Sequence, residues 1–234
     1  MLATLGISLC PNDIYTYAGL LSGAIAHPLD IKVATLGELN ALAMARDLDI
    51  VKISAALFPR IEDTYDKTSV GATSAQKGIG PKLVALSPNP EGTKVATPSR
   101  YSSASLAVET FFPHLSQTEV PLESIISAVC EGKTSYGIVV NEAMNDLKSL
   151  GLHVIADLGQ LWLAHYATPL PLGLVAIKRS LGSALKTQFE LWVRQSLSWS
   201  RANHDQAIDL ALLWCLEKNR TLAEAHITAF VGSC

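Results

Sequence analysis

The sequence lacks the residue spacings that mark metal and redox sites. Its 234 residues include only four cysteines, which are far apart and form no Cys-x-x-Cys pair. Closely spaced ligands are needed for a zinc site or a redox dithiol, so we interpret these cysteines as reduced thiols. The six histidines show neither His-x-His nor His-x-x-x-His spacing. We therefore predict no bound metal.

The sequence also has little charge and no long apolar segment. Charged residues make up 17% of the chain, the formal net charge is −3, and no dense run of Lys and Arg occurs. These features argue against a nucleic-acid partner. No window reaches the roughly 20 apolar residues of a membrane span. The run at 2–9 has no basic start and reads as a buried strand rather than a secretory signal. We expect a cytoplasmic protein that acts without nucleic acid or membrane.

Short apolar runs alternate with helical patterns, which is typical of a mostly parallel α/β sheet. In the first half of the chain we predict strands at 2–9, 29–34, 50–53 and 82–87, and helices at 14–22, 35–46 and 55–62. In the second half we predict strands at 94–97, 135–140, 153–156 and 174–177, and helices at 102–111, 122–131, 181–198, 205–217 and 222–230. Thr35 and Glu38 form a capping-box pattern at the start of one helix.

Two α/β units followed by a returning chain predict two lobes. Turn-forming residues at 87–93 and the Pro-rich segment at 167–173 are the expected connections. We therefore expect residues 1–90 with 172–234 to form the first lobe and residues 91–171 the second. Ligands of open α/β sheets bind beyond the carboxyl ends of the strands. This favours a ligand cleft between the lobes.

Polar residues follow three predicted strands where a helix begins. Asn12 or Asp13 follows the first strand and can cap its helix, and Ser54 can cap another. Ser102 and Ser103 stand at the third junction. Hydroxyls and the free N–H groups of helix starts suit a carboxylate. One such junction is ordinary capping, whereas three at the same end of adjacent strands predict a polar cleft.

Three further features carry weaker signals. Asn40 lies within a predicted helix, where Asn is mildly disfavoured, so it is either exposed to solvent or turned into the cleft. The segment Gly-Ile-Gly-Pro at 78–81 lacks the spacing of a dinucleotide fingerprint, and we interpret it as a linker. His165 is of interest because it precedes the Pro-rich segment.

Taken in order, several segments resemble one family. They are Cys10-Pro11-Asn12-Asp13, Leu39-Asn40, Lys52-Ile53-Ser54, Gly78-Ile79-Gly80-Pro81, Ser102-Ser103, Gly137–Glu142, Asp157-Leu158-Gly159 and Pro169-Leu170-Pro171-Leu172-Gly173. The first and the last are the most specific. From Gly6 to about Phe230 the chain resembles the 1,4-dihydroxy-6-naphthoate synthases of the futalosine route to menaquinone. The resemblance implies a two-lobed periplasmic-binding-protein-like type II fold with mixed sheets flanked by helices.

The resemblance also implies a cofactor-free lyase that converts cyclic dehypoxanthinyl futalosine to 1,4-dihydroxy-6-naphthoate. In such enzymes hydroxyl and backbone donors hold the substrate carboxylate, and Ser54, Ser102 and Ser103 match these positions. Asn40 matches a polar wall position. We add Asn12 and Asp13 to the expected substrate-binding residues. A small carboxylate substrate is the expected partner, and a homodimer is left open.

The chain departs from the family at one important position. Where the family has Ile-Ile-His-Glu, with His as the expected proton acceptor, this chain has Val-Val-Asn-Glu ending at Glu142. Asn141 cannot take a proton at neutral pH. Three explanations stand: a replacement that traps a ligand, a natural variant using His165, Glu142 or Asp13 as base, or a relative that binds without catalysis.

Two rival functions follow from the same features. A small-carboxylate-binding relative of the same fold is favoured by the missing His at Asn141. Chorismate dehydratase is a neighbour in fold and pathway, but the Cys-Pro-Asn-Asp segment at 10–13 argues against it because this segment marks the naphthoate synthases.

Overall fold

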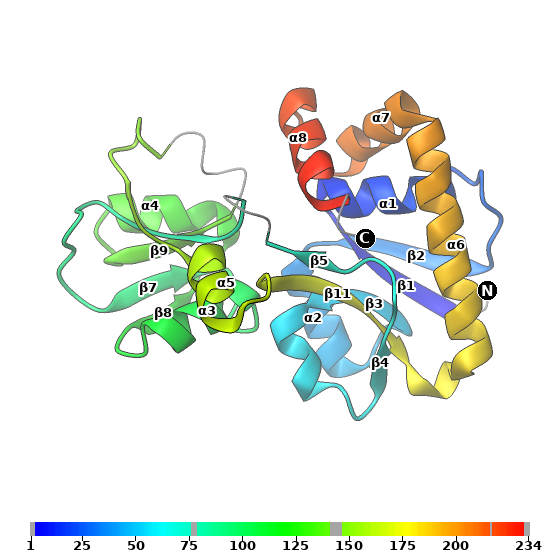
Figure 1. Cartoon of the computed structure of the whole chain (residues 1–234), viewed down its shortest axis with the longest axis horizontal. Coiled ribbons are helices and arrows are strands. Elements are labelled where there is room, and N and C mark those ends of the chain that lie inside the picture. The colour runs from blue at the N-terminus through cyan, green and yellow to red at the C-terminus, as the bar shows by residue number, and fades with distance from the viewer. Residues whose placement is uncertain (1–2, 76–78, 141–146, 216, 232–234) are drawn as a thin grey trace. The chain divides into compact units, whose positions relative to one another are not determined.

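The chain divides into two compact units. The computed structural model describes residues 3–75, 79–140, 147–215 and 217–231. One unit comprises Met1–Thr73 with Gly173–Cys234, and the other comprises Ser74–Leu172 (Figure 1). The first connection lies earlier than the expected turn at 87–93, because the strand at Lys82–Ala85 pairs with strands of the second unit. Residues 74–90 therefore belong with the second unit.

The first sheet has the strand order β2-β1-β3-β11-β4, and β5 pairs with β11. The bounds are β1 Ala3–Ser8, β2 Leu29–Ala34, β3 Ile50–Ser54, β4 Tyr65–Lys67, β5 Thr73–Ser74 and β11 Pro171–Lys178. Strand β1 runs parallel to β2 and β3, whereas β11 runs antiparallel to β3 and β4. The carboxyl ends of β1 and β3 consequently lie side by side.

Helices cover both faces of this sheet. The α-helices are α1 Pro11–Leu21, α2 Leu36–Ala45, α6 Gly182–Ala202, α7 His204–Trp214 and α8 Arg220–Val231, and the 3₁₀ segments are η1 Ala55–Arg60 and η4 Arg179–Leu181. Figure 1 shows α1, α6, α7 and α8 on one side of the strands and α2 on the other. None of the helices in the described part of the chain is both long and apolar enough to span a bilayer.

Alternation along β1 explains how both faces are filled. Leu5 and Ile7 are fully buried in the core that includes α1 and α6. The residue between them points to the opposite face. A Cβ at Gly6 would lie 2.6 Å from Leu48 Cδ1 and 2.7 Å from Leu39 Cδ2. A larger residue at this position would require the Leu39 and Leu48 side chains to move, so glycine suits the close packing of α2 and the following loop on the sheet.

An acidic side chain holds the amino ends of the central strands together. Asp49 accepts hydrogen bonds from the backbone N–H and the hydroxyl of Thr4, each at 3.0 Å, and from Lys178 Nζ at 3.0 Å. Burial on its own raises the pKa of Asp49, but these hydrogen bonds and the Lys178 charge outweigh it, so the pKa lies below the ordinary value. The carboxylate therefore stays charged at neutral pH and links β1, β3 and β11.

The second sheet has the strand order β10-β6-β9-β7-β8. Its strands are β6 Lys82–Ala85, β7 Lys94–Thr97, β8 Ser116–Glu119, β9 Tyr136–Val139 and β10 His153–Asp157, and its helices are α3 Ser103–Phe111, η2 Leu122–Ser124, α4 Ile125–Cys130 and α5 Leu158–Tyr166. Helices α3 and α5 pack on one apolar face of this sheet. Helix α4 packs on the other face.

Several elements depart from the sequence predictions for physical reasons. The helix expected at 55–62 is a 3₁₀ segment that ends at Arg60, and it contains Pro59, which lacks a backbone N–H. Strand β8 was not predicted because its sequence, Ser-Gln-Thr-Glu, has no apolar alternation. It forms an edge of its sheet, where polar side chains are tolerated. Strand β4 and helix α5 were also not predicted.

The close contact between α1 and α6 generates a stability prediction. A Cβ at Gly19 would lie 2.9 Å from the backbone Cα of Ser196, which cannot move without shifting α6. We expect Gly19→Ala to lower the free energy of unfolding by about 1–3 kcal/mol, because overpacking outweighs the better helix propensity of alanine. Urea unfolding followed by circular dichroism measures this change.

Gly37 provides the matched control. It lies in the first turn of α2, and a Cβ there would meet nothing within 4 Å. We expect Gly37→Ala to be neutral or to stabilise the protein by up to about 1 kcal/mol. Equal effects of the two substitutions would contradict the close approach of α1 to α6.

Candidate functional site

A polar group lies at the carboxyl end of β1, where the chain turns into α1. Ser8 is the last residue of the strand, and its hydroxyl donates to Asp13 Oδ2 at 2.5 Å. The same Ser8 oxygen accepts the backbone N–H of Cys10 at 3.2 Å. Both Ser8 and Asp13 are buried. The turn therefore places a carboxylate inside the molecule, in the first turn of the helix.

A buried lysine on the neighbouring strand compensates the charge of this carboxylate. Lys52 Nζ donates to Asp13 Oδ1 at 2.8 Å and to the carbonyl oxygen of Gly71 at 2.7 Å. The side chains of Lys52 and Asp13 are each only 4% exposed. Ions taken out of water cost several kcal/mol each unless they are paired and hydrogen bonded. Lys52 and Asp13 meet this requirement, because they are paired with each other and hydrogen bonded to Gly71 and Ser8 respectively.

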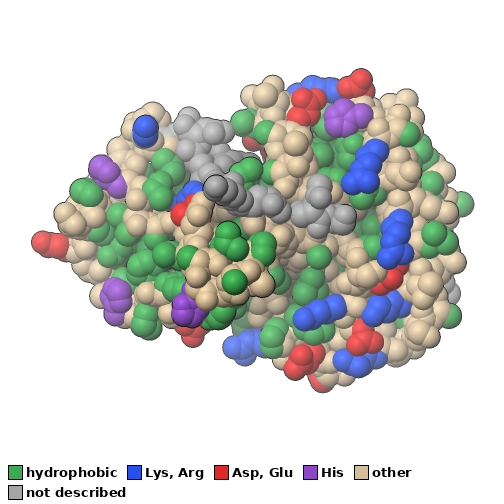
Figure 2. All heavy atoms as spheres, in the orientation of Figure 1, with side chains coloured by type: hydrophobic (Ala, Val, Ile, Leu, Met, Phe, Trp, Pro, Cys, Tyr) green, Lys and Arg blue, Asp and Glu red, His purple; other side chains and the backbone are tan. Residues whose placement is uncertain are grey.

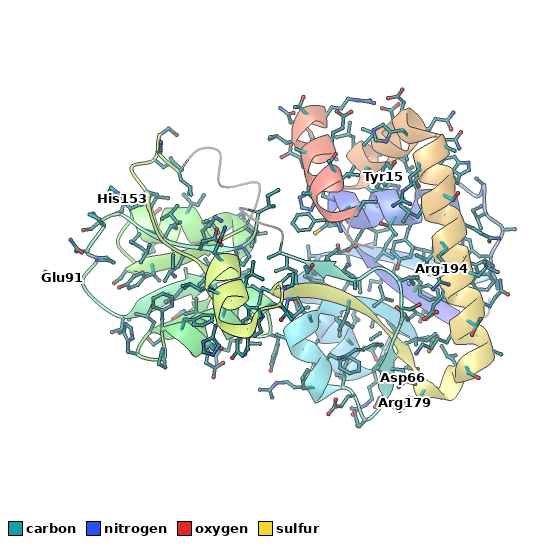
Figure 3. All side chains as sticks on the ribbon, in the orientation of Figure 1. Tyr15, Asp66, Glu91, His153, Arg179 and Arg194 are labelled. Carbon is teal, nitrogen blue, oxygen red and sulfur yellow. The ribbon has the colours of Figure 1, made fainter. Side chains whose placement is uncertain are left out.

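The loop that supplies the Gly71 carbonyl is fastened to α6. The backbone N–H of Ser69 donates to Glu190 at 2.8 Å, and Arg194 donates to the Ser69 hydroxyl at 2.8 Å. Figure 3 labels Arg194 on this helix. Burial by itself raises the pKa of Glu190, but the Ser69 hydrogen bonds and the Arg194 charge outweigh it and hold the pKa below its ordinary value. Helix α6 thus fixes the oxygen that Lys52 contacts.

Asn12 lies between the carboxylate and the C-terminal helix. Its Nδ2 donates to Asp13 Oδ1 at 3.2 Å, and its Oδ1 lies 2.8 Å from His226 Nε2. Since an amide oxygen can only accept, Nε2 carries the proton in this hydrogen bond. Asn12 is buried. Both ends of its side-chain amide are therefore held.

A second polar pair lies at the carboxyl end of β3. Asn40 Nδ2 donates to Ser54 Oγ at 3.0 Å, and the backbone N–H of Ser54 donates to Asn40 Oδ1 at 2.9 Å. Both residues are buried. Asn40 is therefore buried, which excludes the solvent-exposed alternative that the sequence left open. Because Ser54 Oγ accepts from Asn40, its own hydrogen is available for another acceptor.

The serines at the start of α3 belong to the second unit. The Ser102 hydroxyl accepts the Ser105 N–H at 3.0 Å, as expected of a helix cap, and donates to Ser105 Oγ at 3.0 Å. Ser105 Oγ in turn donates to the Ser99 carbonyl at 2.6 Å. The Ser103 hydroxyl makes a longer contact of 3.4 Å to the Leu172 carbonyl. This group is thus largely satisfied within its own unit.

We expected the three junctions to lie at the same end of adjacent strands, but they do not share one sheet. Those of Asp13 and Ser54 follow β1 and β3 of the first sheet, whereas that of Ser102 follows β7 of the second sheet. The structure brings Asn12 together with Asp13, and Asn40 together with Ser54. Asn141 and Glu142 lie outside the described residues.

Two predicted helix caps are wrong. The N-cap residue of α1 is Cys10, and Pro11 occupies the first helical position, so Asn12 and Asp13 lie inside the first turn. Ser54 precedes η1 without a side-chain capping bond, because its hydroxyl pairs with Asn40 instead. The capping box of Thr35 with Glu38 is confirmed.

His165 lies in an aromatic cluster on α5. Its ring centroid is 5.7 Å from that of Phe111 and 4.5 Å from that of Tyr166, and the Tyr166 ring lies tilted against Trp162 with centroids 4.4 Å apart. Figure 2 shows hydrophobic side chains at the surface over this helix. The contacts of His165 are thus with aromatic rings of its own unit. Asp13, another candidate base, has both carboxylate oxygens occupied by hydrogen bonds.

Sequence reasoning missed three residues of the site: Ser8, Lys52 and His226. A signal existed for Lys52, since a lysine between Val51 and Ile53 interrupts an otherwise apolar strand. Ser8 and His226 carry no comparable signal. In the part of the chain that the structure describes, no three His, Cys, Asp or Glu residues gather as a metal site would require.

Comparisons with known proteins identify the family to which the chain belongs. A family model described as "Menaquinone biosynthesis" matches residues 3–233. This chain belongs to that family. It is 28% identical to a 1,4-dihydroxy-6-naphthoate synthase of Thermus thermophilus, over 98% of this chain and 85% of the relative. It is 29% identical to the enzyme of that name from Streptomyces coelicolor, over 96% and 83%.

Solved structures identify the fold. Protein AF1704 from Archaeoglobus fulgidus superposes with a TM-score of 0.90 at 26% identity, covering 98% of this chain and 88% of that one. The Candida albicans CA3427 gene product, described as having the generic periplasmic binding protein fold, gives a TM-score of 0.69 at 12% identity, over 98% and 81%. The menaquinone-biosynthesis chain therefore has a periplasmic-binding-protein-like α/β fold.

The buried ion pair generates a second stability prediction. Lys52→Met removes the cation and leaves the Asp13 carboxylate buried without its charged partner. We expect a loss of about 3–5 kcal/mol in the free energy of unfolding, measured by urea titration. Adding Asp13→Asn removes the unpaired charge, so the double variant should recover a large part of the loss. A double variant no more stable than Lys52→Met would contradict the importance of the pair.

Proposed function

We propose that this protein is a carbon–carbon lyase that converts cyclic dehypoxanthinyl futalosine to 1,4-dihydroxy-6-naphthoate. The observation that carries the proposal is the buried group around Asp13 and Lys52. It is built from Cys-Pro-Asn-Asp and Lys-Ile-Ser, two of the segments that carry the family resemblance. The family match over residues 3–233 and the names of both curated relatives support it. A cytoplasmic location and action without a cofactor are part of the proposal.

The first unit supplies polar groups that are already oriented. Asn40 holds the Ser54 oxygen as an acceptor, which leaves the Ser54 hydrogen to donate to a substrate carboxylate. Fixed donors of this kind need no reorganisation when charge develops on a substrate. We propose that Ser54 binds the substrate carboxylate and that Asn12, Asp13 and Asn40 shape the polar wall around it.

The second unit supplies a helix start instead of free hydroxyls. The Ser102 hydrogen is already donated to Ser105, so this serine acts first as the cap of α3. Ser102 contributes to carboxylate binding indirectly. Its oxygen caps the start of α3, and the N–H groups of the first turn of that helix can donate to the carboxylate. We propose that Ser103, whose hydroxyl makes a long contact of 3.4 Å to the Leu172 carbonyl, turns its hydroxyl to the substrate.

A second candidate function is a carboxylate-binding relative without catalysis. The observation in its favour is Asn141 at the position where the family has its proton acceptor. An amide there removes general-base catalysis, which typically contributes about 10²–10⁴ in rate. Binding without turnover would then be the retained activity.

Restoring the base separates the two candidates. We expect Asn141→His to raise kcat by about 10²–10⁴, because a positioned imidazole accepts the proton that the amide cannot. Formation of the naphthoate chromophore from cyclic dehypoxanthinyl futalosine gives the rate. Asn141→Gln keeps the amide and is the control. Turnover that is the same in all three proteins would contradict the role of this position, and absence of substrate binding would contradict the proposed function.

The anion-binding role of the α3 serines has its own test. We expect Ser102→Ala with Ser103→Ala to weaken substrate binding about 5–150-fold, which corresponds to roughly 1–3 kcal/mol of lost hydrogen bonding. Isothermal titration calorimetry measures the affinity. Thr35→Ala also removes a helix cap, at the exposed start of α2, and so controls for lost stability. Affinity equal to that of the control would show that the carboxylate binds elsewhere.

A further inference from the structure

One side chain of the helix α8 forms a hydrogen bond with the start of the first helix. His226 Nε2 on α8 lies 2.8 Å from Asn12 Oδ1 on α1, a hydrogen bond between residues 214 positions apart. The imidazole is packed against the Phe230 ring, with centroids 4.8 Å apart. Phe230 is buried, so the ring of His226 is held from one side by the core.

The helix that carries His226 is itself tied down at its start. Arg220 donates to Asp205 and Asp209 of α7 at 2.6 and 2.7 Å, and to Glu224 of its own helix at 2.8 Å. Helix α8 therefore presents His226 to α1 from a fixed position.

The hydrogen bond decides which way the Asn12 amide faces. A terminal amide can be turned over by rotation about its last torsion, which exchanges its oxygen and nitrogen. With His226 donating to Oδ1, Nδ2 faces Asp13 and donates to its Oδ1 at 3.2 Å. Turned over, the amide would place its oxygen against the Asp13 carboxylate, and His226 Nε2–H would face an NH₂ group. One donor on α8 thus selects one of two states.

We propose that His226 is a positioning residue for the Asn12–Asp13 part of the site. It acts through Asn12 and not on the substrate itself. The inference rests on the proposed function for its kinetic consequence, but the hydrogen bond can be tested without a substrate. The sequence around His226 gives no sign of this role, and the other five histidines of the chain cannot be told apart from it by their sequence.

A pair of amide substitutions isolates the donor. In glutamine the side-chain NH₂ stands about where His Nε2 stands, whereas in asparagine it is one methylene shorter and cannot reach Asn12. In the Asn141→His background we expect His226→Asn to lower kcat/KM about tenfold, the scale of one net hydrogen bond. We expect His226→Gln to stay within about threefold of the parent. Thr228→Ala, at an exposed position of the same helix, should leave kcat/KM unchanged.

A double-mutant cycle with Asn12→Ala shows whether His226 acts through Asn12. The expected result is that His226→Asn has no further effect on kcat/KM once Asn12 is alanine. Additive losses, equal losses for the glutamine and asparagine variants, or no loss in either would overturn the proposal.

The tautomer of His226 provides a test that needs neither substrate nor a variant. The geometry requires the neutral imidazole to carry its proton on Nε2, which long-range ¹⁵N–¹H correlation spectra of the wild-type protein report directly. A proton on Nδ1 would overturn the proposal. Failure of the wild type and of Asn141→His to bind cyclic dehypoxanthinyl futalosine, with the Nε2 tautomer present, would instead contradict the proposed function alone.

Discussion

The buried pair of Asp13 and Lys52 constrains how the elements of the first unit are arranged. Two charges removed from water are tolerated only when each is surrounded by compensating partners. The structure provides them from four places: Ser8 at the end of β1, Asn12 in the first turn of α1, Lys52 on β3, and the Gly71 carbonyl in the loop after β4. One electrostatic requirement thereby fixes the relative positions of a strand end, a helix start and a loop.

The same requirement explains two glycines. Gly71 has a φ of +70°, a backbone conformation that side chains rarely adopt, and a Cβ there would lie 2.7 Å from Val175. A Cβ at Gly173 would lie 2.8 Å from Lys52 Cε. Gly71 therefore allows the backbone conformation of the loop whose carbonyl contacts Lys52, and Gly173 leaves room for the Lys52 side chain. Gly173 is also the last residue of the Pro-Leu-Pro-Leu-Gly segment, which gives that family signature a physical meaning in this unit.

The polar groups of the two units differ in character. In the first unit the partners of Asp13 and Ser54 come from separate elements, so the polar atoms are held by tertiary contacts. In the second unit Ser102 and Ser105 satisfy one another within a single turn of α3. Loss of one partner in the first group therefore affects several elements, whereas the second group is local. The positions of Asp13 and Ser54 therefore depend more on tertiary contacts than those of the serines of α3 do.

Local periodicity and short ordered motifs were enough to predict the α/β class, most strands, the capping box at Thr35 and the family. It also located Asn40 and Ser54, though not their mutual hydrogen bonds. The folded structure was needed to show that Lys82–Ala85 joins the second sheet and that Lys52 neutralises Asp13. It alone brought His226 to Asn12. Strand pairing and buried charge pairs join residues distant along the chain, and no local pattern records such a partner.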